Sequence, residues 1–351
     1  MATDLIRVQM PLRHPLRSAR GTETVRDVIL VRVVGDDGVA GWGECSALAR
    51  PTYTAEYTDA AWAVLRDHLV AGLDVVGHPM AVAALRGAEQ DAALRRQNRS
   101  LVDRVASRLG RPATAVARTA VIGRQGTVAG LVAEVADRMA AGAAMVKLKA
   151  TPHPDDLAAV AEVRATFPDL ALAVDGNGTL DSRSVTMLDG LGLVYIEQPA
   201  PADDLVTSAR LARRCDTPIA LDESVTSAAV LETAAAIGAG AVVNIKPARL
   251  GGVNSAVETI AVATDVGWSM FVGGMLETGV GRAAALALAA SPACTLPTDL
   301  GPSDHYFVRD ITEPILVDDR GQVLVPTGTG IGVTPIDAVL DEVTVDRLTF
   351  S

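Results

Sequence analysis

Cysteine and histidine are scarce and scattered in this chain of 351 residues. The three cysteines, Cys45, Cys215 and Cys294, stand singly without CxxC spacing, and an odd number of isolated cysteines argues against a disulfide framework. The five histidines include no HExxH motif and no other pair with metal-ligand spacing. These absences exclude a disulfide scaffold and a histidine-rich zinc or iron site.

Long apolar runs and basic runs are also missing. The N-terminal MATDLIRVQMPLRHPL lacks the apolar core of a secretory signal, and charges interrupt the Ala-rich stretches well short of a membrane span. Acidic residues outnumber basic ones, 42 to 31, and no run of Lys or Arg would follow a phosphate backbone. We expect a cytoplasmic homo-oligomer with no nucleic-acid or membrane partner.

From about residue 115 onward, short apolar or β-branched runs alternate with Ala-rich amphipathic stretches. This alternation predicts βαβ units around a buried parallel sheet. The spacing of about 25 residues favours a (β/α) barrel, and no GxGxxG follows the first run to favour an open doubly wound sheet. The predicted strands are TAVI at Thr119, MVKLK at Met145, LALAVD at Leu170, LVYIE at Leu193, PIALD at Pro218, AVVNIK at Ala241, SMFVGG at Ser269 and CTLPTDL at Cys294.

The regions before and after these runs have a different pattern. Residues 1–115 contain strand-like runs around a DDG turn signal, followed by helical stretches at 60–73 and 80–109, which is typical of an α+β unit. The tail from Ile311 returns to strand and turn signals. We predict an α/β protein with a catalytic barrel at 116–310 and a capping domain formed by 1–115 and the tail 311–351.

Three successive predicted strands end on a carboxylate, at Asp175, Glu197 and Asp222. In a (β/α) barrel, the C-terminal strand ends form the active site, so these oxygens would meet at one point. A single Asp at such a turn is commonly a helix N-cap. Three clustered carboxylates repel one another unless a cation is bound, and hard oxygen ligands suit Mg²⁺, with Mn²⁺ as an alternative.

Lysines stand on either side of the three predicted metal ligands. Lys147 and Lys149 lie two apart on the second run, so both side chains share one face of the strand. Burying two ammonium groups side by side is costly, and this cost would lower the pKa of Lys149 toward that of a general base, so that it can lose its proton. Lys246 ends the sixth run, half a turn around the barrel from the second.

This arrangement predicts proton abstraction next to a carboxylate. A small carboxylate substrate on the metal would have one lysine on each face of its α-carbon, and the metal would stabilise the resulting enediolate. Racemisation and β-elimination both fit. A lone lysine at a strand end could be a solvated side chain, and an inactive structural barrel would require all five strand-end residues to be incidental.

Several motifs, in this order, resemble the enolase superfamily, specifically its muconate-lactonising subgroup and the o-succinylbenzoate synthase / N-succinylamino acid racemase (N-acylamino acid racemase) family. The resemblance implies a modified TIM barrel of (β/α)7β form, Mg²⁺ on the three carboxylates, and Lys149 and Lys246 as acid–base groups. The motifs are GWGEC at Gly41, PTYTAEY at Pro51, VKLKA at Val146, VDGN at Val174, IEQP at Ile196, LDES at Leu221, NIKPARLGG at Asn244, GGMLETGVGR at Gly273, DITEP at Asp310 and VPTGTGIGV at Val325.

The resemblance also implies roles for residues around these groups. Lys147 would lie beside the substrate carboxylate, and Asn177 and Glu223 would orient the metal ligands. Arg249, in IKPAR, matches an arginine that accompanies racemase activity in the family, where a nearby positive charge would tune Lys246.

Loop positions near the barrel mouth depart from the family pattern. Arg20, Arg50 and Val121 stand where relatives tend to carry an aromatic residue, a glycine and a hydroxyl residue. Two extra cations at the mouth would favour a more acidic substrate, unless they simply face solvent.

Two segments are candidate substrate contacts. Tyr53 lies in PTYTAEY, and the GGMLETG segment contains Gly273, Gly274 and Glu277. The two glycines would expose backbone N–H groups to the substrate, although ordinary loop packing explains both segments equally well.

The leading functional prediction is Mg²⁺-dependent racemisation of N-succinyl or other N-acyl amino acids, with or without the dehydration that gives 2-succinylbenzoate in menaquinone synthesis. Muconate-type cycloisomerisation would use the same groups but protonate only one face. Dipeptide epimerisation is less favoured, because GGMLETG lacks the acidic pair expected to hold a dipeptide ammonium group.

Overall fold

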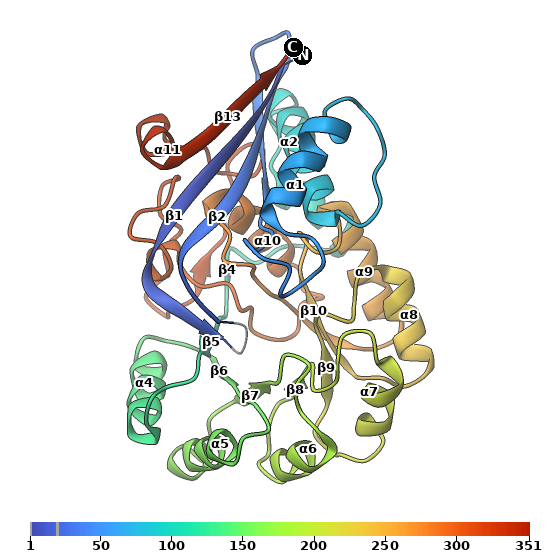
Figure 1. Cartoon of the computed structure of the whole chain (residues 1–351), viewed down its shortest axis with the longest axis vertical. Helices are drawn as coiled ribbons and strands as arrows, with labels where there is room; N and C mark the ends of the chain where they lie inside the picture. Colours follow the sequence, from blue (N-terminus) through green and yellow to red (C-terminus); the bar gives the residue numbers. More distant parts are fainter. Residues whose placement is uncertain (1, 19–20) are drawn as a thin grey trace.

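The computed structural model describes residues 2–18 and 21–351, without the side chains of residues 16–18, 21, 22 and 304. Two parts are evident in Figure 1: an antiparallel sheet with its helices, and a curled parallel sheet surrounded by helices. No helix in the described ranges is long and apolar enough to cross a membrane.

The capping domain is built on a four-stranded antiparallel sheet in the order β13-β1-β2-β3. The C-terminal strand β13 forms one edge, with Phe350 opposite Thr3 of β1. Thus the end of the tail joins the N-terminal sheet. The strands are β1 (Ala2–Ser18), β2 (Gly21–Val34), β3 (Ala40–Cys45) and β13 (Thr344–Phe350).

Helix α2 packs against β3 at very short range because the strand carries glycines. A Cβ atom on Gly41 would lie 2.2 Å from the Ala88 carbonyl oxygen, and one on Gly43 would lie 1.9 Å from that of Ala84. The GWGEC motif therefore allows backbone contact between strand and helix. The capping helices are α1 (Thr58–Val64) with the π-helical turn η1 (Leu65–Leu69), α2 (Pro79–Arg96) and α3 (Leu101–Leu109).

The parallel sheet confirms the predicted fold class. Its seven strands lie in sequence order, and a helix follows each of them. Several strands are shorter than the apolar runs that predicted them. The strands are β5 (Thr119–Ile122), β6 (Met145–Lys149), β7 (Leu172–Asp175), β8 (Ile196–Glu197), β9 (Ile219–Leu221), β10 (Val242–Ile245) and β11 (Ser269–Val272), and the helices are α4 (Val128–Ala140), α5 (Pro154–Thr166), α6 (Ser182–Asp189), α7 (Leu205–Ala212), α8 (Ala228–Ala236), α9 (Val253–Asp265) and α10 (Gly279–Ala289).

The eighth predicted run is an extended segment rather than a strand of this sheet. Its Leu296 N–H donates to the Met270 carbonyl of β11 (3.1 Å), and the Thr119 N–H of β5 donates to its Thr298 carbonyl (2.7 Å). Residues 296–299 therefore join the two edge strands. The tail contains β12 (Val323–Leu324), which pairs with β4 (Ala115–Val116), the short helix η2 (Ser303–His305), and helix α11 (Asp337–Val343), which the strand and turn pattern did not predict.

Buried side chains fill the barrel below its C-terminal end. One cluster, in which every member is at most 4% exposed, is formed by Met145, Ala173, Tyr195, Ala220, Val242 and Phe271. The Tyr195 and Phe271 rings stack with centroids 5.3 Å apart. This apolar layer lies directly beneath the polar residues at the strand ends and forms the floor of the barrel opening.

Candidate active site

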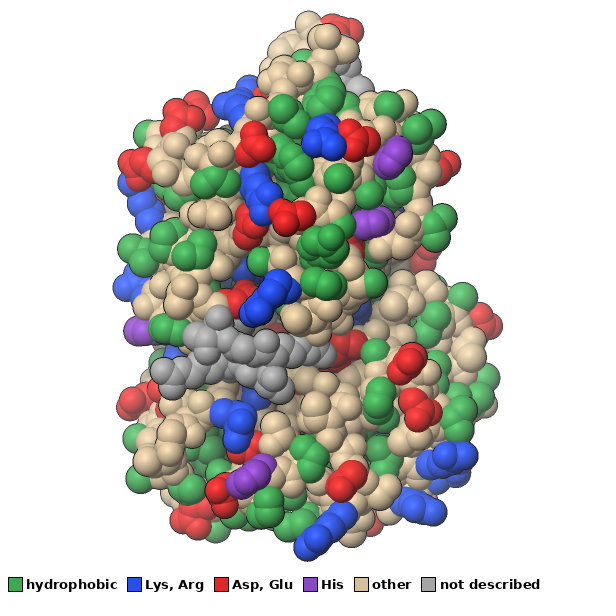
Figure 2. Space-filling view, viewed as in Figure 1, with side chains coloured by type: hydrophobic (Ala, Val, Ile, Leu, Met, Phe, Trp, Pro, Cys, Tyr) green, Lys and Arg blue, Asp and Glu red, His purple; other side chains and the backbone are tan. Residues whose placement is uncertain are grey.

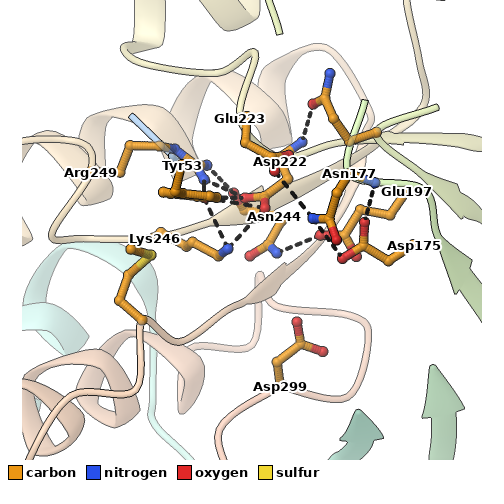
Figure 3. Close-up of polar contacts among 12 residues, drawn as sticks. Tyr53, Asp175, Asn177, Glu197, Asp222, Glu223, Asn244, Lys246, Arg249 and Asp299 are labelled. Atoms are coloured by element: carbon orange, nitrogen blue, oxygen red, sulfur yellow. Dashed lines mark hydrogen bonds and ion pairs between the residues drawn. The ribbon is translucent and has the colours of Figure 1, made fainter. Parts of the chain in front are cut away.

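The strand ends bring the three predicted metal ligands to the same level. Lys149 of β6 pairs with Asp175 of β7, which pairs with Glu197 of β8, and all three are the last residues of their strands. Asp222 and Lys246 follow β9 and β10 directly. The three carboxylates are at most 3% exposed, and Figure 3 shows their side chains grouped together.

The Lys149 ammonium lies at one side of this group. Its Nζ donates to Asp175 Oδ2 (2.6 Å) and to Asn177 Oδ1 (2.8 Å), and the side chain is 26% exposed. Asn177 also donates from its backbone N–H to Asp175 Oδ1 (2.9 Å) and from Nδ2 to Glu223 Oε1 (3.2 Å). Asn177 therefore links the first carboxylate with Glu223, in line with a supporting role.

Lys246 lies at the other side, beyond the three strands that carry the carboxylates. Its Nζ donates to Asp222 Oδ2 (2.8 Å) and to the Tyr53 hydroxyl (3.0 Å), and it lies 4.8 Å from the centroid of the Tyr53 ring. Tyr53 comes from the capping domain. The residue predicted as a substrate contact thus touches a candidate catalytic lysine.

Arg249 is buried, at 1% exposure, and shares both partners of Lys246. Its Nη1 donates to Asp222 Oδ1 and to the Tyr53 hydroxyl (2.5 Å), and its Nη2 donates to the Asn244 carbonyl (2.9 Å). Although burial opposes ionisation of Asp222, Lys246 and Arg249 hold the pKa of this carboxyl well below its ordinary value. Burial and the positive charge of Arg249 act to lower the pKa of Lys246, but Asp222 and Tyr53 outweigh both, and the pKa of Lys246 is raised above its ordinary value.

Lys147 is the most deeply placed of the three lysines, at 2% exposure. Its Nζ donates to Glu197 Oε2 and to Asp299 Oδ2, each at 2.5 Å, and lies 4.9 Å from the Phe271 ring centroid. Burial lowers the pKa of Lys147, but Asp299 and Glu197 outweigh it and raise the pKa well above its ordinary value. The adjacent lysines thus avoid mutual repulsion because each ammonium group faces its own carboxylates.

The donor set fits a hard divalent cation. Burial raises the pKa of Glu197 to about 8, and the neighbouring charges of Asp175 and Asp222 add to this shift against the opposing effect of Lys147. As the side chains stand in the described chain, no three acidic, His or Cys residues are arranged to hold an ion, because the ammonium groups lie among the carboxylates. Three buried carboxylates that repel one another are nevertheless the ligands that Mg²⁺ takes in proteins.

A cavity of about 200 Å³ opens over these groups. Its lining includes lysines and carboxylates together with Val121, Leu276, Leu300 and Tyr306. Val121 is 41% exposed, and Arg50 is exposed without lining this cavity. Arg20 lies outside the described residues. On the face drawn in Figure 2, acidic and basic side chains are interspersed without a continuous basic patch.

The GGMLETG segment differs from its predicted role in one respect. The Gly273 N–H is not available to a substrate, because it donates to the Ile245 carbonyl (2.9 Å). This glycine is needed for space, since a Cβ there would lie 2.2 Å from Asn244 Oδ1. Gly274 lines the cavity, and the Glu277 carboxylate accepts the Met275 N–H (2.5 Å), which fixes the loop.

Three polar residues of the site were not predicted. Asn244 donates from Nδ2 to Glu197 Oε1 (2.7 Å), and its position two residues before Lys246 on the same strand face was a usable signal. Asp299, the partner of Lys147, is the next-to-last residue of the eighth predicted run, where a carboxylate near a strand end was again a usable signal. Gln198 accepts the Asp222 and Ser224 N–H groups (2.9 and 3.2 Å), and nothing in a single sequence indicates that role.

Family models match most of the chain. The mandelate racemase / muconate lactonizing enzyme N-terminal domain matches residues 1–105, and the enolase C-terminal domain-like family matches residues 130–339. These matches correspond to the capping domain and the barrel. The chain therefore has both halves of an enolase-superfamily enzyme.

Known relatives refine this class. An N-succinylamino acid racemase from Amycolatopsis sp is 41% identical over 98% of this chain and 97% of its own, and an o-succinylbenzoate synthase from Geobacillus stearothermophilus is 37% identical over 93% and 90%. A solved structure described as a probable mandelate racemase from Alicyclobacillus acidocaldarius has a TM-score of 0.89 at 36% identity, covering 99% of this chain and 98% of its own. The chain belongs to the o-succinylbenzoate synthase / N-succinylamino acid racemase family, as its motifs predicted.

Proposed function

We propose that this enzyme removes and returns the α-proton of N-succinyl or other N-acyl amino acids with the help of Mg²⁺. The observation that carries the proposal is the placement of Lys149 and Lys246 on opposite sides of the three buried carboxylates. The names of the relatives, N-succinylamino acid racemase and o-succinylbenzoate synthase, support the substrate class.

The residues of the chain would divide the work as follows. Asp175, Glu197 and Asp222 would hold the ion, which supplies positive charge to the enediolate that forms as the proton leaves. Lys149 would take the proton from one face of the α-carbon, and Lys246 would deliver a proton to the other face. Lys147, which is fixed in the floor of the cavity, would face the substrate carboxylate. Racemisation results because either lysine can act as base.

Dehydration to 2-succinylbenzoate is a second candidate, because it begins with the same proton abstraction and because relatives carry that name. Arg249 matches an arginine that accompanies racemase activity in the family and contacts Asp222 and Tyr53 next to Lys246, which favours the racemase. A lysine on the second face is needed only when a proton must be returned there.

Proton exchange in D₂O tests this proposal. With Mg²⁺, NMR should show deuterium at the α-carbon of N-succinyl-L-phenylalanine, and polarimetry should show the optical rotation falling to zero as the D-enantiomer forms; excess EDTA should abolish both. Lys149→Ala and Lys246→Ala should each lower turnover at least about 100-fold, as expected for loss of a general acid–base group. Unchanged exchange in both variants would contradict the proposed mechanism.

A further inference from the structure

Asp299 lies at the end of the extended segment that joins the two edge strands of the barrel. Its backbone is held by the hydrogen bond from its N–H to the Val272 carbonyl (3.1 Å). Its side chain is 10% exposed and lines the cavity. Oδ2 accepts from Lys147, whereas Oδ1 is buried and has no hydrogen-bond partner among the described residues. Figure 3 shows Asp299 on a separate loop, on the side of the site opposite the grouped side chains of Asp175, Glu197 and Asp222.

Lys147 is shared equally between two anions. Its Nζ lies 2.5 Å from both Glu197 Oε2 and Asp299 Oδ2. In the described part of the chain, no other side chain accepts a hydrogen bond from it, and its remaining close contact is the Phe271 ring. An ammonium group at 2% exposure needs an anion, because a buried unpaired charge is strongly destabilising.

Glu197 would have to bind both a metal ion and the Lys147 ammonium group. It is a proposed metal ligand, and it is also one of the two carboxylates that neutralise Lys147. A positive ion bound to Glu197 would compete with the ammonium group for the same oxygens. Metal binding therefore requires another anion to keep Lys147 in place.

We propose that Asp299 is a positioning residue that retains Lys147 when Glu197 turns to the metal, so that the ammonium group stays in the cavity floor. The inference rests on the metal site of the proposed function. Without Asp299, Glu197 would be the only anion left to Lys147, and the metal would have to displace a buried ion pair. Asp299 thereby raises Mg²⁺ affinity through Lys147 rather than through its own charge.

The substitution Asp299→Asn keeps the size of the side chain and the backbone hydrogen bond to Val272. We expect it to weaken Mg²⁺ binding about tenfold or more, in the range seen when groups that support metal ligands are removed. In a Lys147→Met background the same substitution should change Mg²⁺ affinity less than about twofold, because the effect requires the lysine.

Magnesium titrations measure this coupling in four proteins: the wild type, Asp299→Asn, Lys147→Met and the double variant. Binding is monitored by calorimetry and by the rise in melting temperature. The alternative, direct attraction between Asp299 and the cation, predicts an equal loss in both backgrounds, and this result would overturn the inference. An unchanged affinity in Asp299→Asn would also overturn it. If Asp299→Asn does not fold, the Mg²⁺ affinities of Lys147→Met and of the double variant are compared instead. The inference requires these two affinities to be equal within about twofold.

A second measurement follows Lys147 directly. The chain contains only three lysines, Lys147, Lys149 and Lys246, so protein labelled with ¹⁵N-lysine gives three side-chain signals. At saturating Mg²⁺ the Lys147 Nζ signal should remain protected from exchange in the wild type and lose protection in Asp299→Asn; equal protection in both would count against the inference. If the wild-type protein does not bind Mg²⁺, the proposed metal site itself is wrong. If the wild type binds Mg²⁺ and Asp299→Asn binds it equally well, only this inference is wrong.

Discussion

At the residue scale, lysine and arginine are distributed differently in this chain. All three lysines of the chain lie in the site, and every other one of its 31 basic residues is an arginine. Arginine stays protonated at any working pH, whereas lysine can release its proton when its surroundings change. The chain thus places all of its lysine ammonium groups around the three carboxylates.

Gly273→Ala tests the space that a glycine leaves for Asn244, which donates to the proposed metal ligand Glu197. The added Cβ would lie 2.2 Å from Asn244 Oδ1, so Asn244 must move and its 2.7 Å hydrogen bond to Glu197 must lengthen. We expect a loss of about 1–3 kcal/mol in the free energy of unfolding, as for other overpacked sites, together with weaker Mg²⁺ binding.

Urea denaturation and a magnesium titration measure these two effects. Gly126→Ala is a matched control, because a Cβ there would meet nothing within 4 Å. Equal stability and equal Mg²⁺ response in the two variants would show that the contact at Gly273 is unimportant.

At the element scale, the capping loop that carries Tyr53 is tied to the start of α2. The Glu56 carboxylate accepts the Met80 and Ala81 N–H groups, each at 2.8 Å, and so satisfies two of the free donors at the N-terminus of that helix. Because Tyr53 and Glu56 belong to the same short loop, this cap also helps to set the position of Tyr53 beside Lys246.

Titration of Glu56 makes stability depend on pH. Burial raises the pKa of Glu56 to about 7, against the opposing effect of the Met80 and Ala81 N–H groups. The folded protein therefore binds this proton more tightly than the unfolded chain, and its contribution to stability is present at low pH and lost as pH rises through about 7. Between about pH 5 and pH 8 the wild type should lose about 2–3 kcal/mol relative to Glu56→Gln.

Urea unfolding of the two proteins at both pH values tests this sign. Glu313→Gln, which removes an exposed carboxyl, serves as a control and should track the wild type. A constant difference between wild type and Glu56→Gln across this range would show that Glu56 does not titrate there.

At the scale of the whole molecule, one buried arginine joins the two domains. Arg26 of β2 is 1% exposed and donates to the Met275 carbonyl of the barrel loop at 3.1 and 3.3 Å. It also donates to the Ala47 carbonyl (2.9 Å) and the Ser46 carbonyl, at the start of the loop that leads to Tyr53. The guanidinium group thus sets the capping loop and the GGMLETG loop relative to one another.

Arg26→Met should separate the contribution of the guanidinium hydrogen bonds from that of packing, because methionine fills much of the same volume but has no hydrogen-bond donors. Four carbonyls, those of Asp27, Ser46, Ala47 and Met275, would lose a partner, so we expect a loss of about 3 kcal/mol or more in the free energy of unfolding. Arg66→Met, at an exposed ion pair with Asp67, is the matched control and should change stability little. Similar urea midpoints for both variants would contradict a joining role for Arg26.

Much of the fold and the centre of the site could be predicted from the sequence. Alternation of short apolar runs with amphipathic stretches predicted the parallel sheet, and a strand that ends on an ionisable residue places that residue at the common edge. This reasoning predicted that Lys149, Asp175 and Glu197 lie side by side at that edge, and the strand register places them there. Helix α11 and the contraction of β8 to two residues were not predictable, because neither depends on the local pattern alone.

The sequence by itself determined which chemical groups are available, since the spacing of residues along parallel strands fixes which side chains reach the same edge. Only the tertiary structure decided how those groups share their charges. Lys147 faces both Glu197 and Asp299, and Lys246 shares Asp222 and Tyr53 with Arg249. Such pairings join residues up to 196 positions apart. They depend on how the two domains and the last barrel segment close over the site, which no local sequence pattern encodes.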